Sequence, residues 1–393
     1  MPAIEIMYIS SILKKNNEVY YTRDLKNENI DGADYIILPS SIIAHETEVK
    51  ALGQLKHKKV FVTGIFANIL RDKYLESHSI VVKNESDTFF FNLDKSENLN
   101  KEYLDRLFDN KHLINEFYSP VSLDELPFPD WGSYVGIYPL RNNFFSLNEK
   151  IAIPLLGTRG CPYSCFNYCT YPLQQGRKVR ARSVENIIDE IKYWQKTLGT
   201  NKFVFRDPVF SIDRKHTIHF CKEVIKQKLN ITFMVETHLN NLDDEMINLL
   251  ATAGLELVYV GIESANHVVL KDMKRFTIEH DKQYKIIKKC EEIGIKVKTM
   301  FIIGNPEDTE DTIMQTIKYS KYLPSLYAQF SVFTPYPGTP IYKDYEDLIY
   351  EKKLENFDQY RLTFRHNHLS ENKIEELKSK AYFKFYFDFS KIL

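Results

Sequence analysis

Three of the chain's five cysteines, Cys161, Cys165 and Cys169, lie together in the stretch GTRGCPYSCFNYCTYP. A thiolate binds metals and carries redox chemistry, so a group of thiols is chemically informative. In a reducing compartment, a tight cysteine group more often indicates metal or redox chemistry than a disulfide framework. The spacing therefore predicts a metal or redox site at residues 161–169.

Three kinds of structure could account for this spacing. Positions i, i+4 and i+8 fit a buried stripe on a helix, but Gly160 and Pro162 break regular structure and favour a loop. A structural zinc site needs a fourth ligand, and the nearest histidines, His112 and His216, are distant in the sequence. Three thiolates on a four-iron cluster would leave one iron open for another molecule. We therefore favour an iron–sulfur cluster over zinc and over a helical stripe.

Polar side chains also recur at the carboxyl ends of candidate strands. In α/β folds, ligands bind at the edge where these strand ends meet. An isolated acidic residue there is commonly a solvated cap, but recurrence along successive strands favours a shared binding site. The residues in question are Asp207, Glu236, Glu263 and Ser264.

The elements that must position these residues begin at residue 151, where apolar runs alternate with amphipathic helical stretches. Six such units with right-handed crossovers would form a curved parallel sheet, short of the eight that close a barrel. We therefore expect an α/β fold, an open partial (βα)6 barrel over residues 151–340, with the cysteines after its first strand. The predicted strands are IAIPLL, KFVFRD, ITFMVE, LVYVGIES, VKTMFIIG and YAQFSVF.

The remaining segments predict smaller parts around this barrel. Residues 1–110 contain DYIILP and KVFVTG, which are apolar on both faces, as in a doubly wound (Rossmann-like) sheet covered by helices. Residues 111–150 lack a sustained period, and we interpret them as a linker that packs on the barrel. Residues 341–393 are charged and aromatic, which indicates a C-terminal helical appendage.

These motifs together resemble the radical S-adenosylmethionine (SAM) superfamily, whose enzymes carry a three-cysteine loop after the first strand of a six-unit partial barrel. The resemblance covers most of the chain and is strongest to the subgroup with an N-terminal cobalamin-binding-like domain. It implies a 4Fe-4S cluster on the three cysteines, SAM on its open iron, and reductive cleavage of SAM to a 5′-deoxyadenosyl radical. The matching stretches are GTRGCPYSCFNYCTYP, QGRKVRARSVENIIDEI, FRDPVFSID, GIESAN, FIIGNPEDTEDT and FTPYPGTP.

The resemblance also implies roles for individual residues. Tyr168 stands where family members place an aromatic ring against the adenine of SAM. Gly304, in FIIGNPEDT, stands where a glycine allows close backbone approach to SAM. The strand-end residues would hold the amino group and ribose of SAM, Glu263 and Ser264 in GIES foremost, followed by Asp207 and Glu236.

The cysteine spacing departs from the family pattern. Relatives have Cys-x3-Cys-x2-Cys, whereas this chain has one additional residue between Cys165 and Cys169. We expect the additional residue, Phe166 or Asn167, to be absorbed as a bulge.

The N-terminal region resembles a truncated cobalamin-binding domain. PAIEIMYISSILKKNNEVYY resembles the first helix and second strand of such domains, so the usual first strand is missing. No Asp-x-His-x-x-Gly motif supplies an axial histidine, and His45 stands outside any such motif. Cobalamin therefore stays open as a cofactor, and we expect a sheet that folds but binds cobalamin weakly or not at all.

Charge and hydropathy limit the kinds of partner that we expect for this chain. Lys and Arg total 52 against 53 Asp and Glu, so no broad positive field attracts nucleic acid. We interpret the basic run at 177–182 as a solvated loop or as one contact to the SAM carboxylate. No apolar run reaches the roughly 18 residues that span a bilayer, and no secretory signal is visible, so we expect a cytoplasmic protein. The expected partners are a small-molecule substrate and an electron donor such as flavodoxin or ferredoxin.

The sequence thus predicts a radical SAM enzyme that methylates, oxidises or rearranges an unactivated carbon of a small metabolite or lipid. One form of this hypothesis uses cobalamin as methyl carrier, and another has lost cobalamin. The alternative is a non-catalytic iron–sulfur or binding protein derived from the same family.

Overall fold

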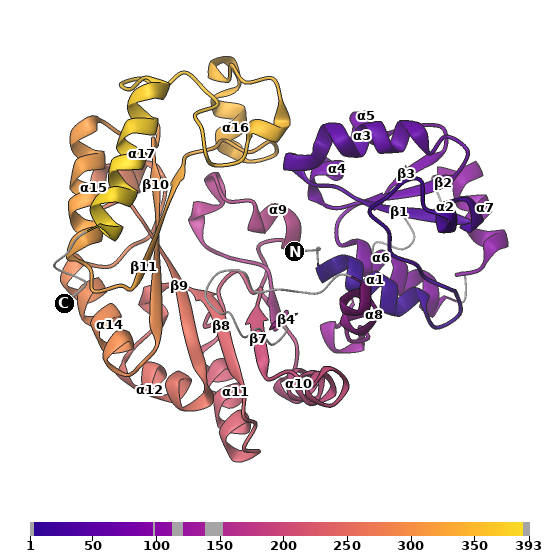
Figure 1. The fold of residues 1–393 in the computed structure, drawn as a ribbon, viewed down its shortest axis with the longest axis horizontal. Helices are drawn as coiled ribbons and strands as arrows, with labels where there is room; N and C mark the ends of the chain where they lie inside the picture. The colour runs from indigo at the N-terminus through magenta and orange to yellow at the C-terminus, as the bar shows by residue number, and fades with distance from the viewer. Residues whose placement is uncertain (1–3, 97–98, 112–120, 138–151, 388–393) are drawn as a thin grey trace. The chain divides into compact units, whose positions relative to one another are not determined.

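The computed structural model describes residues 4–96, 99–111, 121–137 and 152–387, which form two compact units (Figure 1). The first unit comprises the described residues up to 153, together with 173–175 and 193–199. The second unit comprises the other described residues from 154 onward. No helix of the described residues is long and apolar enough to cross a membrane.

The first unit is built on a small parallel sheet with strand order β1-β2-β3. The strands are β1 (Tyr35–Pro39), β2 (Lys59–Thr63) and β3 (Ser79–Val81). The helices are α1 (Ile4–Leu13), α2 (Glu28–Gly32), η1 (Ile42–Ala44), α3 (His45–Gln54), α4 (Ile65–Ile69), α5 (Arg71–Tyr74), α6 (Ser86–Lys95), α7 (Lys101–Asp109), η3 (Leu123–Glu125) and α8 (Trp131–Ile137).

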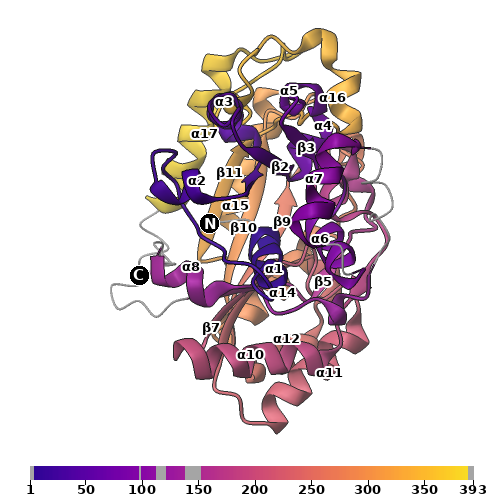
Figure 2. The same cartoon turned by 90° about the vertical axis from the view of Figure 1, so that its right-hand side faces the viewer.

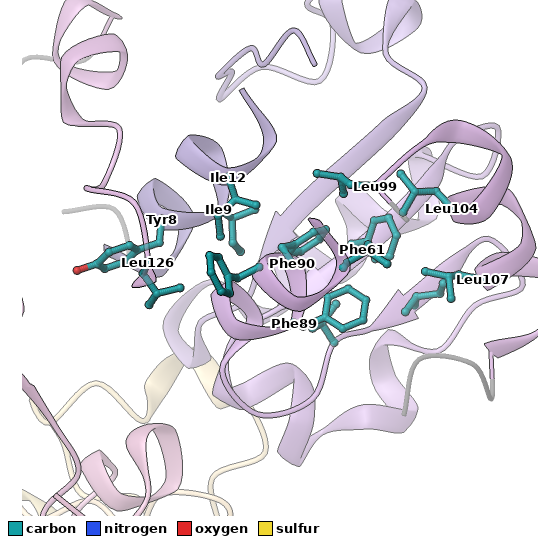
Figure 3. Packing of buried hydrophobic residues seen from close by; sticks show 14 of the residues in the cluster. Tyr8, Ile9, Ile12, Phe61, Phe89, Phe90, Leu99, Leu104, Leu107 and Leu126 are labelled. Carbon is teal, nitrogen blue, oxygen red and sulfur yellow. The ribbon is translucent and has the colours of Figure 1, made fainter. Parts of the chain in front are cut away.

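Helices cover both faces of this sheet, which confirms the doubly wound prediction. On one face, the Phe61 ring of β2 packs against Phe90 of α6 and Phe108 of α7, with ring centroids 5.3 and 5.0 Å apart. Figure 3 shows this cluster with Ile9 and Ile12 of α1. On the opposite face, Val60 and Val62 pack with residues of α3, α4 and α5. Successive side chains of a strand point to opposite faces, so a run of consecutive apolar residues, such as Val60, Phe61 and Val62, is buried on both.

The strand expected at EVYY is absent, so that part of the sequence interpretation was wrong. Residues 18–22 have no regular structure, and Tyr20 is exposed. The hydroxyl of Tyr21 instead donates to Asp130 Oδ2 at 2.9 Å, and Ser10 also donates to that carboxylate. A segment whose residues favour β-structure does not become a strand when no neighbouring strand is present to share its backbone hydrogen bonds.

The described part of residues 111–150 belongs to the first unit. Residues 121–137 contain η3 and α8, and Trp131 is completely buried. The expected packing of residues 111–150 on the barrel stays a prediction, and residues 112–120 and 138–150 lie outside the described ranges.

The second unit is built on six parallel strands in the order β11-β10-β9-β8-β7-β4, an open sheet as predicted. All six predicted strands are present within two residues of their expected bounds. They are β4 (Ala152–Leu155), β7 (Lys202–Phe205), β8 (Thr232–Thr237), β9 (Leu255–Glu263), β10 (Lys296–Ile303) and β11 (Tyr327–Val332), and β5 (Thr158–Arg159) and β6 (Arg180–Ala181) form a separate pair.

Helices follow the strands of this sheet, with α11, α12, α14 and α15 along its outer face (Figures 1 and 2). The bounds are α9 (Tyr171–Gln175), α10 (Val184–Leu198), α11 (Arg214–Lys226), α12 (Asp244–Ala253), α13 (His267–Asp272), α14 (His280–Glu292), α15 (Glu310–Tyr322), α16 (Pro340–Asp344) and α17 (Glu371–Tyr386). Short 3-10 turns are η4 (Ser164–Asn167), η5 (Leu239–Asn241), η6 (Glu346–Leu348) and η7 (Leu354–Asn356).

The C-terminal segment is helical over α17, which covers the edge strand β11. The Tyr382 hydroxyl accepts from Phe330 N and donates to Phe330 O, each at 3.2 Å. The Tyr386 hydroxyl does the same for Ala328, at 3.1 and 2.7 Å. An exposed edge strand leaves backbone donors and acceptors unpaired, and these two hydroxyls pair the backbone groups of Ala328 and Phe330 in β11.

Candidate active site

The cysteine loop begins where β4 ends, at the carboxyl edge of the parallel sheet. Thr158 and Arg159 of β5 pair antiparallel with β6, which ties the start of the loop to the chain that follows it. The amide of Cys161 then donates to Gly176 O at 3.1 Å. The loop is therefore anchored on both sides of the cysteines.

Gly160 is required at the first turn of this loop. Its φ is +92°, and a Cβ there would lie 2.1 Å from Lys178 O. Between Cys161 and Cys169 the chain forms only the short turn η4, so the cysteines do not lie on a continuous helix. The prediction that Gly160 and Pro162 favour a loop is confirmed.

One cavity of about 110 Å³ brings together most of the residues singled out in the sequence. Cys161 and Cys165 are buried and Cys169 is partly buried. Parallel strands place their carboxyl ends at one edge, which is why residues distant in sequence meet there. The predicted residues that line the cavity are Cys161, Cys165, Cys169, Tyr168, Glu236 and Glu263.

Three predicted residues do not line this cavity. Asp207 is buried beside the loop, where its carboxylate accepts from Gly157 N at 2.8 Å and from Thr158 Oγ1 at 2.7 Å. Ser264 is also buried, and its hydroxyl lies 3.2 Å from Thr316 Oγ1 and accepts from Asn266 N. The hydrogen bonds of both side chains stabilise the chain around the cavity.

Gly304 has a local structural role that the sequence comparison did not suggest. Its φ is +76°, and a Cβ there would lie 3.0 Å from Ile374 Cδ1 of α17. The close approach at Gly304 is therefore to the chain's own helix. Its predicted approach to SAM stays a prediction.

Arg275 is the cation of the cavity, and sequence reasoning missed it. Its Nη2 donates to Gly261 O at 2.9 Å and lies 3.5 Å from Glu263 Oε1. Its Nη1 lies 3.8 Å from Cys165 Sγ. No spacing pattern marks this arginine, because it follows β9 by a whole helix and returns to the site only through the turn after α13.

Glu263 enters the cavity through a local irregularity of β9. The register between β9 and β10 shifts so that Met300 pairs with Gly261 and Phe301 pairs with Glu263. Glu263 itself has φ +66°, a conformation that non-glycine residues adopt at an energetic cost and that clusters at functional sites. The bulge re-aims this carboxylate toward Arg275.

Burial dominates the titration of the three thiols. It raises the pKa of Cys161 and of Cys165, and Arg275 acts in the opposite direction on both. Burial raises the pKa of Cys169 to about 12. Thiols in this setting keep their protons until a metal centre displaces them, so metal binding would release protons.

Glu236 and His238, two further titratable groups of the cavity, are shifted toward their neutral forms. Burial raises the pKa of Glu236 to about 7, with Arg206 opposing the shift, and the Tyr171 hydroxyl lies 3.3 Å from its Oε2. Burial lowers the pKa of His238 to about 4. Its Nδ1 accepts from Asn240 N and its Nε2 faces Phe276 O, so the ring is neutral with the proton on Nε2.

The donor set fits an iron–sulfur cluster. Within the described ranges, no three histidine, cysteine, aspartate or glutamate side chains converge closely enough to hold a single metal ion. Each thiolate of a four-iron cluster binds a different iron, so cluster ligands surround the metal core and do not meet at one point. Three thiols that face one cavity satisfy that requirement, and soft thiolate ligands select such clusters.

The segment that contains the cavity residues is similar to known proteins. Residues 155–320 match the family model of the radical SAM superfamily. An uncharacterized methyltransferase of Pyrococcus horikoshii is 29% identical over 282 residues, 71% of this chain and 60% of that protein. The anaerobic magnesium-protoporphyrin IX monomethyl ester cyclase of Rubrivivax gelatinosus is 29% identical over 266 residues, 65% of this chain and 44% of that protein. The chain spans about half the length of the curated relatives it matches.

Two solved structures share the fold. The radical SAM methyltransferase TsrM of Kitasatospora setae superposes with a TM-score of 0.65 at 15% identity, covering 88% of this chain and 73% of TsrM. The cobalamin-dependent SAM radical enzyme OxsB superposes with a TM-score of 0.62 at 15% identity, covering 81% of this chain and 49% of OxsB.

Proposed function

We propose that this chain, whose residues 155–320 match the family model of the radical SAM superfamily, is an enzyme that cleaves SAM reductively to modify an unactivated carbon of a small metabolite or lipid. The observation that carries the proposal is the cavity itself. Three thiols of one loop open into the same space as Tyr168, Glu236 and Glu263, at the carboxyl edge of a parallel sheet.

Cys161, Cys165 and Cys169 would hold a 4Fe-4S cluster. When bound, this cluster would supply one electron for reductive cleavage of the carbon–sulfur bond of SAM, which would give methionine and a 5′-deoxyadenosyl radical. We propose that the electron comes from flavodoxin or ferredoxin in the cytoplasm.

The cavity matches the charges of SAM. Its amino acid part carries a carboxylate and an ammonium group, and the cavity offers the Arg275 guanidinium together with the Glu236 and Glu263 carboxylates. Tyr168 offers an aromatic surface for the adenine. Glu236, with a pKa near 7 and Tyr171 beside it, is able to hold or release a proton at neutral pH.

The names of the relatives favour carbon chemistry on a small molecule. Several of them are methyltransferases or a cyclase, and one of these is a bacteriochlorophyllide d C-12(1)-methyltransferase of Chlorobaculum tepidum. We propose methyl transfer, oxidation or cyclisation as the class of outcome for this chain. A non-catalytic iron–sulfur protein is not favoured, because the cavity keeps charged groups beside the thiols.

The test is anaerobic reconstitution with iron and sulfide, followed by SAM and dithionite and by chromatography for 5′-deoxyadenosine. We expect the wild-type protein to hold one cluster and to form 5′-deoxyadenosine. The triple Cys161→Ala, Cys165→Ala, Cys169→Ala variant should do neither, whereas Cys221→Ala and Cys290→Ala, at buried helical positions, should match the wild type. A cluster-loaded wild type that leaves SAM intact would contradict the proposal.

A further inference from the structure

The segment Lys274–Phe276, which follows α13, contacts the cysteine loop directly through Lys274 and Arg275 and indirectly through Phe276. The Ser164 hydroxyl donates to Lys274 O at 2.8 Å, and Lys274 Nζ donates to Asn167 Oδ1 at 3.4 Å. The next residue, Arg275, places Nη1 3.8 Å from Cys165 Sγ. Two consecutive residues therefore contact the loop between Cys161 and Cys169 at three points.

The third residue, Phe276, is connected to the loop through the ring of His238. Phe276 stacks on His238 with ring centroids 5.6 Å apart, and His238 packs against Tyr163 of the loop with centroids 5.3 Å apart. The Nε2 of His238 also donates to Phe276 O at 3.0 Å. His238 is thereby fixed between the segment and the loop.

The backbone holds the segment in this position. Lys274 has φ +52°, a left-handed conformation that a lysine keeps only when the surrounding structure requires it. The amide of Arg275 turns back to donate to Leu270 O at 2.9 Å. This turn is what aims Lys274 O, Lys274 Nζ and the Arg275 side chain at the loop.

One of these contacts is made to the part of the loop that is longer than in the family pattern. Asn167 lies between Cys165 and Cys169, within η4, and its side chain is buried. The amides of Tyr168 and Cys169 both donate to Cys165 O at 3.1 Å, so the longer interval closes as a compact turn. The side-chain oxygen Oδ1 of Asn167 faces Lys274 Nζ, which donates a hydrogen bond to it.

We propose that Lys274 is a positioning residue that holds Asn167, so that the longer Cys165–Cys169 interval still presents all three thiols to one cavity. The inference rests on the proposed function only in taking the loop to be a cluster site. The lysine takes no part in the chemistry. It acts through Asn167 on the placement of Cys165 and Cys169.

The test compares cluster stability in Lys274→Met, Asn167→Ala and the double variant. After anaerobic reconstitution, iron and sulfide are counted per chain, and iron loss to a chelator is followed by visible absorption. Residues that support metal ligands typically change affinity by about 10- to 100-fold, so we expect cluster loss about tenfold faster in each single variant. The double variant should be no worse than either single one, because both break the same contact.

Two matched variants separate positioning from a general effect of charge or folding. Lys271→Met removes a lysine from α13 without touching the loop and should keep the wild-type rate of cluster loss. Lys274→Arg keeps a donor toward Asn167 and should restore most of the stability and the wild-type electron paramagnetic resonance spectrum of the reduced cluster. Thermal unfolding of the apo forms should be alike in all variants.

Deleting Asn167 supplies the decisive comparison. The deletion returns the loop to Cys-x3-Cys-x2-Cys, and in that background Lys274→Met should no longer accelerate cluster loss. Wild-type kinetics in Lys274→Met, additive effects in the double variant, or an unchanged effect of Lys274→Met after the deletion would overturn the inference. A wild type that binds no cluster would instead overturn the proposed function.

Discussion

The side chains of Glu263 and Arg275 meet beside the α-carbon of Gly261, and Arg275 Nη2 lies 3.5 Å from Glu263 Oε1. A Cβ on Gly261 would lie 2.3 Å from that Oε1 and 2.8 Å from Nη2. The absence of a side chain at residue 261 is therefore what allows the carboxylate and the guanidinium to face each other in the cavity.

Gly261→Ala should weaken SAM binding while sparing the cluster. The methyl group displaces the far ends of two flexible side chains, so we expect a stability loss at the lower end of the about 1–3 kcal/mol that overpacking costs. SAM affinity, measured by equilibrium dialysis on the reconstituted protein, should fall about tenfold if about 1.4 kcal/mol of charge complementarity is lost.

Gly53→Ala is the matched control. Gly53 lies in α3 with nothing near its Cβ position, so alanine there should raise the free energy of unfolding by about 0.5–1 kcal/mol and leave SAM affinity unchanged. Equal SAM affinity in Gly261→Ala and the wild type would show that the Glu263–Arg275 arrangement does not matter for SAM.

Asp207 should make the apo protein less stable as pH rises through the weakly acidic range. Burial raises the pKa of this carboxyl from its usual 3.8 to about 6, while Thr158 and Gly157 oppose the shift. The folded state therefore binds more protons than the unfolded state between these values. The stability contributed by protonated Asp207 is fully present below about pH 4 and is lost as pH rises through about 6.

Asp207→Asn removes this dependence. Between about pH 4 and pH 6, its free energy of unfolding should gain up to about 3 kcal/mol relative to the wild type, since each pKa unit corresponds to about 1.4 kcal/mol. Urea titrations at several pH values measure the difference. A difference between the two proteins that does not change with pH would rule out the raised pKa of Asp207.

Tyr382 and Tyr386 should contribute to stability through their hydroxyl groups. Tyr382→Phe and Tyr386→Phe each leave a backbone donor and acceptor of β11 without their partner, at a cost of about 1–3 kcal/mol. Faster amide hydrogen exchange at Phe330 or Ala328 should accompany the loss. Tyr360→Phe, at an exposed ring, should have an effect below about 0.5 kcal/mol.

Cobalamin should bind weakly or not at all. The carboxyl ends of β1 to β3 are bridged by the chain's own groups: Ser40 Oγ accepts from Ala67 N at 2.8 Å, and Asn68 Nδ2 reaches Gly64 O and Val82 O, each at 3.1 Å. In doubly wound sheets, cofactors sit at this edge. Titration of the purified protein with hydroxocobalamin should show no binding as tight as a Kd of about 1 μM, which corresponds to a binding free energy of about −8 kcal/mol. Tighter binding would restore cobalamin-dependent methyl transfer as the favoured reaction.

The architecture was predictable because it depends on local patterns. The six barrel strands are apolar runs at regular intervals, and the structure contains each of them. The cysteine loop was predictable because Gly160 and Pro162 exclude regular structure whatever the rest of the chain does. By contrast, EVYY has the composition of a strand but no neighbouring strand to pair with, and pairing is a tertiary property.

The sequence by itself determined which strand ends carry polar residues, but only the tertiary structure decided which of those residues face the cavity. Glu263 ends β9 and Ser264 follows it, and of the two only Glu263 lines the cavity. The bulge between β9 and β10 turned Glu263 inward, and Ser264 instead contacts Thr316. Arg275 reaches the site only because the turn at Lys274 brings the chain back to Cys165. Side-chain direction at a strand end depends on register and on distant contacts, neither of which is written in local spacing.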